Sequence, residues 1–261
     1  MTELKTIFIT GAAGGMGSST AKLFKEKGWF IGCYDINKEN LENLEKELGN
    51  NNIIYAQLDV TDKGQFEECL NSFSLKTKNK LDILFNNAGI TEGGFFEEIP
   101  YQNHINIINI NIIGVINGIY SASKLLKNTP NSLCISTSSS SGIMGMEMIA
   151  TYSATKHAVK GLTESLSAEF SRFDTRVSDI LPGVIDTPMI SNEIKSNLPK
   201  DGIWRLISSS EIANAVWESY HSNKIHWYVP RELEDLEKQV AESPEKTMEK
   251  LRKSGPLSSD S

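Results

Sequence analysis

Tyr152 and Lys156 lie four residues apart in the segment TYSATKHAVKG, residues 151–161. If this segment is helical, the two side chains lie on the same face of the helix. An ammonium group close to a phenol favours the phenolate and lowers a pKa that is ordinarily about 10. Lowering that pKa to about 7 takes ~4 kcal/mol, and the tyrosine can then exchange a proton with an alcohol or a ketone. The pair is a candidate acid–base site, although the same spacing also occurs by chance in ordinary helices.

A run of hydroxyl side chains, residues 136–141 in ISTSSSSG, is a second candidate for chemistry. Serine tracts are commonly solvated linkers, because they bury little apolar surface. This tract, however, follows the strand-like run SLCIST (132–137), and ligands of open α/β sheets bind at the carboxyl ends of strands. The tract by itself does not show which hydroxyl would react.

The segment TGAAGGMG (10–17) joins an apolar strand-like run to a helical one. Its glycines Gly11, Gly15 and Gly17 permit a tight turn and allow backbone N–H groups to approach a pyrophosphate at a helix start. Asp35 follows some twenty residues later, at the end of the next apolar run. A carboxylate there accepts hydrogen bonds from a ribose diol and repels a 2′-phosphate, whereas the alternative is an acid at a helix start. With no Lys or Arg in the loop, and with Lys38 expected to be a solvated helix residue, the pattern favours NAD over NADP.

The rest of the chain alternates short apolar runs with longer amphipathic ones, a pattern typical of a parallel sheet covered by helices. The expected strands are 6–10, 30–35, 53–59, 81–86, 132–137, 176–181 and 225–229. The expected helices are 16–28, 38–49, 62–74, 103–127, 152–172 and 209–222. The pattern predicts one doubly wound α/β domain of the Rossmann type over residues 1–230, with a seven-stranded parallel sheet and helices on both faces. Residues 231–261 are expected to form a helical tail with a disordered end.

Composition argues against several classes of partner. The net charge is −7 and no long block of Lys or Arg occurs, so neither nucleic acid nor an anionic membrane is expected as a partner. The apolar run 105–120 contains four asparagines after its first residue, which favours a buried helix over a membrane span. The scattered cysteines predict free thiols in a reducing cytoplasm. No metal is expected, because the chain's histidines lack metal-binding spacing and are assigned surface or packing roles: His104, His157, His221 and His226.

Five segments together resemble the short-chain dehydrogenase/reductase family. They are TGAAGGMG, NNAG (86–89), NIIG (111–114), SGIMGMEMIATYSATK (141–156) and PGVIDTPM (182–189). Each segment is modest evidence alone, but the five occur in the family's order over residues 6 to about 190. The resemblance implies a Rossmann-type nucleotide-binding oxidoreductase.

The resemblance also implies roles for individual residues. The family's serine precedes the tyrosine by about a dozen residues, which points to Ser139, with Ser138 the alternative if the loop is shifted. Ser139 would hold the substrate oxygen, Tyr152 would be the general acid/base, and Lys156 would lower the tyrosine pKa and bind the nicotinamide ribose. Asn111 would support a water in the proton relay; it is preferred over the neighbouring asparagines because Gly114 follows it at the family's spacing.

The cofactor contacts implied by the resemblance come from several loops. NNAG and Asp59 would pack on the adenosine side, and the segment 182–189 would hold the carboxamide. The full set, besides Tyr152 and Lys156, is Gly11, Gly15, Met16, Gly17, Asp35, Ile36, Asp59, Val60, Asn87, Ala88, Gly89, Pro182, Gly183, Ile185 and Thr187.

The expected activity is hydride transfer between NAD(H) and an apolar secondary alcohol or ketone. Residues 189–207 mix apolar and charged side chains and are expected to form a substrate lid. One alternative is an NADP-dependent reductase of carrier-bound 3-oxoacyl groups, and another is a non-catalytic nucleotide-binding protein. The family's C-terminal Gly-Gly pair is missing, so a homodimer through the helices 103–127 and 152–172 is expected, with a homotetramer also open.

Overall fold

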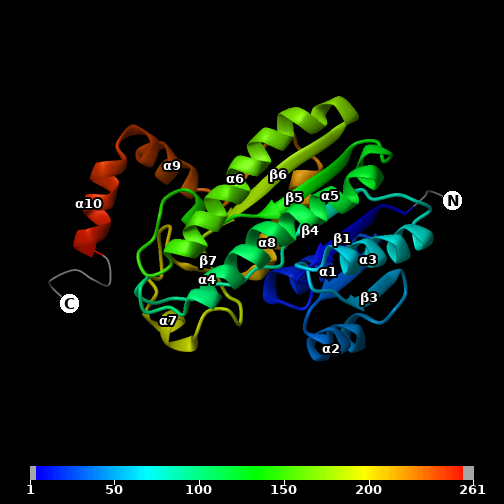
Figure 1. Cartoon of the computed structure of the whole chain (residues 1–261), viewed down its shortest axis with the longest axis horizontal. Coiled ribbons are helices and arrows are strands. Elements are labelled where there is room, and N and C mark those ends of the chain that lie inside the picture. The colour runs from blue at the N-terminus through cyan, green and yellow to red at the C-terminus, as the bar shows by residue number, and fades with distance from the viewer. Residues whose placement is uncertain (1–3, 255–261) are drawn as a thin grey trace.

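The computed structural model describes residues 4–254. Seven parallel strands form one sheet in the order β3-β2-β1-β4-β5-β6-β9, and Figure 1 shows helices on both of its faces. The strands are β1 (Thr6–Thr10), β2 (Phe30–Asp35), β3 (Ile53–Gln57), β4 (Ile83–Asn86), β5 (Ser132–Thr137), β6 (Thr175–Pro182) and β9 (His226–Val229). Every predicted strand is therefore confirmed, with ends shifted by at most two residues, and so is the predicted fold class.

The helices fall into two layers on this sheet. They are α1 (Gly15–Glu26), α2 (Lys38–Leu48), α3 (Lys63–Lys76), α4 (Tyr101–Ile108), α5 (Gly114–Lys127), α6 (Ala150–Phe170) and α8 (Ser209–Tyr220). Helices α1, α2 and α8 share one buried cluster with the sheet, and α3, α5 and α6 share another.

Alternation along the central strands produces the two clusters. In β1, Ile7 and Ile9 face the α1 side and Phe8 faces the α3 side, where its ring stacks on Tyr34 at a centroid distance of 3.9 Å. Successive side chains of a strand point to opposite faces, so a sheet covered on both faces needs apolar residues at consecutive positions. This is why the strand runs lack polar alternation in the sequence.

The order of the strands opens a crevice at the carboxyl ends of the central strands. β1 pairs with β2 on one side and with β4 on the other, so the chain direction across the sheet reverses between β1 and β4. Parallel strands present their carboxyl ends at the same edge, and the reversal opens a crevice there. The loops that follow β1, β2, β4 and β5 meet at this edge.

The predicted helix 103–127 is interrupted. A π-helical turn, Asn109–Ile113, separates α4 from α5. By length and composition alone, Tyr101–Lys127 is apolar enough to cross a membrane, and 44% of its most apolar window is buried. In the fold, Val115, Ile119 and Leu126 of this helix pack into the cluster with α3 and the sheet, as expected for a core helix.

Residues 182–207 form small elements that the sequence did not indicate. A two-stranded sheet pairs β7 (Val184–Ile185) with β8 (Leu206–Ile207), and α7 (Asn192–Asn197) lies between them. An ion pair of 2.7 Å joins Lys195 to Asp186 across this segment.

The tail is helical, as expected, in α9 (Leu233–Glu242) and α10 (Pro244–Ser254). Leu233 and Leu236 of α9 pack on Ile143, Met144 and Leu181, so α9 lies over the carboxyl ends of β5 and β6. Figure 1 shows α10 extending from α9 away from the sheet. Of the segment 254–261, expected to be disordered, Ser254 ends α10, and residues 255–261 lie outside the described residues.

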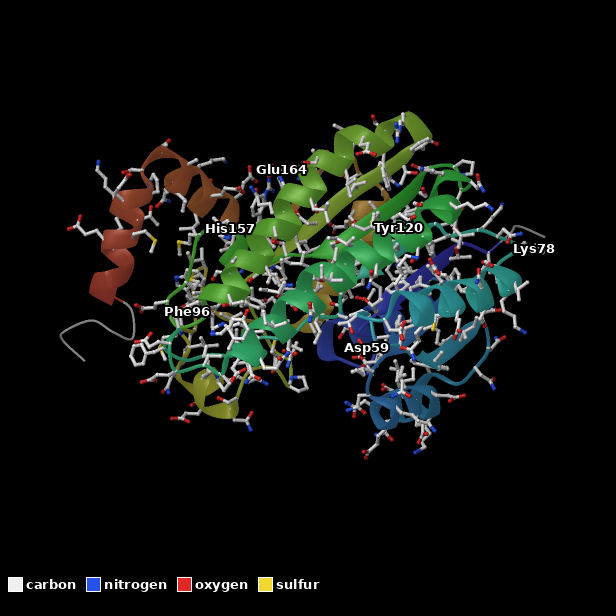
Figure 2. The ribbon with its side chains drawn as sticks, in the orientation of Figure 1. Asp59, Lys78, Phe96, Tyr120, His157 and Glu164 are labelled. Atoms are coloured by element: carbon white, nitrogen blue, oxygen red, sulfur yellow. The ribbon has the colours of Figure 1, made fainter. Side chains whose placement is uncertain are left out.

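Buried charges join the tail to the sheet and to α6. Asp179 of β6 is fully buried, and its Oδ1 lies 2.8 Å from Nδ1 of His226. Nε2 of His226 lies 3.3 Å from Glu164, which Figure 2 labels on α6. Lys160 of the same helix pairs with Glu164 and, at 2.6 Å, with Glu237 of α9.

This network makes stability depend on pH. Burial raises the pKa of Asp179 to about 6. For His226, burial is the largest single influence and lowers the pKa, but the hydrogen bond with Asp179 and the negative charges of Asp179 and Glu237 together outweigh it, so the pKa is raised. Both groups thus bind protons more tightly in the folded chain than in the unfolded one, and stability falls as pH rises through these folded pKa values.

We expect the free energy of unfolding, measured with urea, to be about 1 kcal/mol larger at pH 5.5 than at pH 8. Asp179→Asn cannot titrate and should flatten this dependence. Urea unfolding of both proteins at three pH values measures the effect, and parallel curves for the two proteins would contradict the assignment.

Candidate functional site

The turn after β1 requires glycine at defined positions. Gly11 has φ +62°, and a Cβ there would lie 2.9 Å from the Ala88 Cα. A Cβ on Gly17 would overlap the Gly11 carbonyl oxygen. The loop therefore closes tightly against the segment after β4, and α1 begins directly behind it. The first-turn N–H groups of α1 lie at the carboxyl edge of the sheet, where they favour an anion.

Asp35 lies at the carboxyl end of β2, where the sequence pattern placed it. Its Oδ2 accepts a hydrogen bond of 3.0 Å from the Ala13 N–H, and its Oδ1 accepts one of 2.9 Å from the Asn37 N–H. The carboxylate is thus held against the glycine-rich loop. Each of its oxygens has a second lone pair for a further donor. Lys38 is largely exposed, as expected, and lies 3.9 Å from Glu42.

A cleft of about 280 Å³ lies between these loops. Among the predicted cofactor contacts, it is lined by Gly11, Gly15, Met16, Asp35, Ile36, Asp59, Val60, Asn87, Ala88, Gly89 and Thr187. The structure therefore brings together predicted residues from the loops after β1, β2, β3, β4 and β7.

The shape and chemistry of this cleft fit a dinucleotide. The tight glycine turn supplies a helix start for a pyrophosphate, and Asp35 supplies an anchored acceptor for a ribose diol. Apolar side chains of Leu58, Val60 and Ile110 line the cleft beside them, and an adenine ring would pack against such a surface.

Other predicted contacts lie outside the cleft lining. Gly17 lies within α1, where it permits the close turn. Pro182 ends β6, and a Cβ on Gly183 would lie 3.2 Å from Pro230. Ile185 is buried in the core cluster, and its strand pairs with β8. These residues support the segment that carries Thr187 into the cleft.

The structure separates Ser138 from Ser139. The Ser138 hydroxyl is fully buried and donates a 2.9 Å hydrogen bond to the Lys156 carbonyl oxygen. The Ser139 hydroxyl accepts one of 3.1 Å from the Ser141 N–H, and its interaction with the Tyr152 side chain lowers the pKa of that phenol. Ser138 is therefore committed to the backbone of α6, whereas Ser139 faces the phenol.

Tyr152 and Lys156 lie together on α6, as their spacing predicts. Lys156 Nζ is 5.4 Å from the centre of the Tyr152 ring and donates a 2.8 Å hydrogen bond to the Thr137 carbonyl oxygen. A Cβ on Gly89 would lie 3.6 Å from this Nζ. The lysine thus bridges the end of β5, the loop after β4 and the tyrosine.

Burial changes the electrostatics expected for this pair. It lowers the pKa of Lys156 to about 8. It also raises the pKa of Tyr152, and the Ser139 hydrogen bond lowers that pKa by less. In the chain without a cofactor, burial of the phenolate therefore outweighs the other influences on the Tyr152 pKa, and its expected lowering by Lys156 stays a prediction for the cofactor-bound chain.

The Asn111 side chain is buried in the π-helical turn and fully used. Its Oδ1 accepts from the Ile90 N–H at 2.9 Å, and its Nδ2 donates to the Ile90 carbonyl at 2.9 Å and to Thr155 Oγ1 at 3.2 Å. The amide thus ties the loop after β4 to α6, in front of Lys156. Asn117 of the same helix instead donates to the Val60 carbonyl.

Several cleft residues were not singled out as cofactor contacts, although some of them lie within the quoted motifs. They are Ala13, Gly14, Asn40, Leu58, Ile90, Ile110, Pro188 and Met189. Most are immediate neighbours of residues that the motifs identified. Asn40 lies on helix α2, and Ile110 lies in the π-helical turn. No local pattern distinguishes either residue from other helical residues.

Comparison with known proteins agrees with this geometry. The family model described as short chain dehydrogenase matches residues 5–197. The chain is 34% identical over 189 residues to a 3-oxoacyl-(acyl-carrier-protein) reductase of Thermotoga maritima, covering 72% of this chain and 76% of that one. It is 30% identical over 212 residues to a 3-alpha-(or 20-beta)-hydroxysteroid dehydrogenase of Mycobacterium bovis, covering 81% and 80%.

A solved structure shares the whole fold. A short chain dehydrogenase/reductase from Burkholderia phymatum, in complex with NAD, superposes with a TM-score of 0.81 at 21% identity. The alignment covers 95% of this chain and 97% of that one. At this identity the likeness concerns the fold.

Proposed function

The chain belongs to the short-chain dehydrogenase/reductase family and is an oxidoreductase of alcohol or carbonyl groups with a nicotinamide cofactor; we propose that the cofactor is NAD and the substrate an apolar secondary alcohol or ketone. The observation that carries the proposal is the convergence of Ser139, Tyr152 and Lys156 beside a cleft that contains an anchored Asp35. When bound, the nicotinamide supplies or accepts the hydride, and its oxidised ring adds a positive charge beside the tyrosine.

Tyr152 and Ser139 act on the substrate oxygen. The Ser139 hydroxyl donates to that oxygen and stabilises the negative charge that develops on it. Tyr152 takes the proton from an alcohol, or returns one to a ketone. The Ser139 side chain interacts with the Tyr152 phenol and lowers its pKa, so a single substrate oxygen could meet both hydroxyls.

Lys156 and Asn111 would assist proton transfer at Tyr152 and would not contact the substrate oxygen. With a pKa of about 8, Lys156 is mostly protonated at neutral pH, and its charge favours the phenolate that forms during alcohol oxidation. It would also hold the nicotinamide ribose. Asn111 fixes the loop and helix around the lysine, where a relay water would lead to solvent.

The cofactor would be held by the loops that line the cleft. The glycine-rich turn would take the pyrophosphate, Asp35 the adenosine ribose, and Asp59, Val60 and the NNAG segment the adenine. The segment that ends in Thr187 would take the carboxamide. An anchored carboxylate at the ribose favours NAD, because a 2′-phosphate would be repelled by it.

The apolar character of the substrate is inferred from the residues beside the site. Met189 of the lid segment lines the cleft and is half exposed, and Ile194 of the same segment is half exposed as well. Exposed apolar groups at a cleft rim favour an apolar ligand. The hydroxysteroid dehydrogenase relative acts on a substrate of this kind by its name.

A second candidate is reduction of carrier-bound 3-oxoacyl groups, which the Thermotoga maritima relative favours. Such a substrate arrives on an acidic carrier protein, and the net charge of −7 here opposes that encounter. Turnover of an acetoacetyl thioester with NADPH, faster than any alcohol oxidation with NAD, would select this alternative.

The direct test combines binding and turnover. Thermal unfolding with NAD, NADH, NADP and NADPH should show stabilisation by the first pair, because a ligand that binds the folded chain raises its apparent stability. Absorbance of NADH then follows oxidation of apolar secondary alcohols. Stabilisation by the phosphorylated pair alone would overturn NAD, and no turnover of any alcohol or ketone would overturn the activity.

Ser139 and Ser138 form a matched pair of variants. Ser139→Ala should lower kcat by roughly 10²-fold, the effect of losing an oxyanion donor, with normal folding. Ser138→Ala should cost about 1 kcal/mol of stability through its lost backbone hydrogen bond and leave kcat within about twofold. Steady-state kinetics and urea unfolding of both measure this contrast, and the reverse pattern would transfer the role to Ser138.

We also propose a homo-oligomer in the cytoplasm. Ile113, Ile116 and Tyr120 are exposed on the outer side of the long helix, where Figure 2 labels Tyr120, and α6 lies alongside. Two copies packed through these helices would cover this apolar surface. The three cysteines are buried free thiols, which suits a reducing compartment.

A further inference from the structure

His104 lies outside every sequence motif of the site, and a packing role is its default assignment. It is half-buried on α4, and both ring nitrogens are engaged. Nδ1 lies 2.7 Å from the Thr151 hydroxyl, one residue before Tyr152. Nε2 lies 3.1 Å from the Phe96 carbonyl oxygen, and the Phe96 ring packs on the imidazole at 4.7 Å. Figure 2 shows Phe96 near α4.

The two contacts define what each nitrogen does. A carbonyl oxygen only accepts, so Nε2 carries the hydrogen and donates to Phe96. In the neutral ring, Nδ1 then accepts the hydrogen of the Thr151 hydroxyl. The ring therefore joins the loop after β4 to the first turn of α6 through two directed bonds.

The first turn of α6 needs this support. Ile149 precedes the helix and supplies no side-chain cap, and Met148 before it has φ +62°. A helix start without a cap leaves N–H groups without partners and is locally less stable than a capped one. Tyr152 lies in this turn, one helical turn before Lys156, which the sheet holds through Thr137.

Two other hydrogen bonds hold the residues around this turn. The Ser153 hydroxyl accepts from the Met146 N–H at 3.1 Å, and the Gly94 N–H donates to the Met148 carbonyl at 2.9 Å. Thr151 has no preceding helical carbonyl for its hydroxyl, because the helix begins at Ala150. Its hydroxyl is thus free to bond across to α4.

We propose that His104 is a positioning residue, whose Nδ1 sets Tyr152 against Ser139 by holding Thr151. This inference rests on the proposed acid–base role of Tyr152. Tyr152 must meet a substrate oxygen shared with Ser139, and a displacement of about 1 Å at such a point costs up to roughly 10²-fold in rate. His104 is not among the residues that line the cleft in the described part of the chain, and it acts through Thr151.

Two amide variants separate the nitrogens. The amide of His104→Asn occupies the place of Nδ1 and can accept from Thr151, whereas the amide of His104→Gln occupies the place of Nε2 and can donate to Phe96. We expect His104→Gln to lower kcat about 10-fold, and His104→Asn to keep it within about threefold. The KM for NADH should be unchanged in both. His221→Gln, an exposed histidine at the end of α8, is the control.

Equal kcat values for the Asn and Gln variants would overturn the proposal, as would a loss confined to Asn. A merely structural role would lower the thermal stability of both variants, and in neither variant would kcat change without a change in KM. Because these amide variants retain one polar contact each, they test the proposal even where His104→Leu does not fold.

Thr151 provides the reciprocal test. Thr151→Ser keeps the hydroxyl and should resemble the native enzyme, and Thr151→Val should resemble His104→Gln. The Val substitution should add little in the Gln background, because the same bond is already lost. Additive losses would overturn the pairing.

Hydrogen exchange distinguishes failure of this inference from failure of the proposed function. Amides of residues 150–153 should exchange several-fold faster in His104→Gln than in His104→Asn, whatever the chain turns over. A native enzyme without turnover on any alcohol or ketone would overturn the function, and equal exchange in the two variants would overturn the positioning role.

Discussion

Tyr152→Phe is expected to lower kcat by roughly 10²–10⁴-fold, the contribution of a positioned general acid/base. The phenyl ring keeps the packing of the tyrosine on α6, and only the hydroxyl shared with Ser139 is lost. The cofactor cleft is lined by other loops, so the Kd for NADH should change by less than about threefold. Single-turnover absorbance and NADH fluorescence measure the two quantities on one preparation.

Tyr55→Phe is the matched control for that variant. Its hydroxyl donates to the Gly49 carbonyl on the far side of β3, away from the cleft lining. It should retain full turnover. Turnover by Tyr152→Phe comparable to this control would exclude the tyrosine as the acid/base, and a loss of NADH binding in Tyr152→Phe would show that the variant disturbs the cleft instead.

Fold class and strand positions were predictable because the sheet is covered on both faces. Runs such as TIFIT must be apolar at consecutive positions to fill two core layers, as Ile7 and Phe8 do. The π-helical turn was not predictable, because its five residues continue an apolar helical pattern. The strands β7 and β8 have two residues each, too few to show a period.

The candidate site was predictable where the backbone dictates the residue type. Gly11 needs φ > 0, and Asp35 ends a strand next to that turn. The choice between Ser138 and Ser139 depends on which hydroxyl is buried against α6, which counting residues could only suggest. The raised pKa of Tyr152 and the lowered pKa of Lys156 depend on burial, a property of the assembled fold that the spacing of two residues does not contain.

The contacts of His104 also could not be predicted from the sequence. A lone histidine in an apolar helix has no signature in sequence, and its two contacts come from residues 96 and 151. They are brought together by packing of α4 on α6. Positioning of a catalytic helix turn is therefore a tertiary property, visible only when both helices are placed.

Replacing Asp35 and its neighbour is expected to reverse the cofactor preference. In Asp35→Ala/Ile36→Arg the repelling carboxylate is removed, and a guanidinium replaces a side chain that is 59% exposed at the cleft. Loss of charge-assisted bonds to the ribose diol costs about 1.5–3 kcal/mol, and a new arginine–phosphate pair contributes a similar amount. The ratio of kcat/KM for NAD to that for NADP should fall by about 10³-fold.

Asp35→Asn separates charge from geometry in this prediction. Its amide oxygen can still accept from the Ala13 N–H, so the loop stays anchored while the repulsion of a 2′-phosphate disappears. The NADP rate should rise in this variant without the arginine, by about 10-fold, and the NAD rate should fall less than in the double variant. Initial rates with both cofactors measure each ratio. If the ratio is unchanged in both variants, the adenosine ribose is held elsewhere. The preference for NAD would then lose its physical basis. In the described part of the chain, no other acidic side chain that lines the cleft is anchored to the glycine-rich loop.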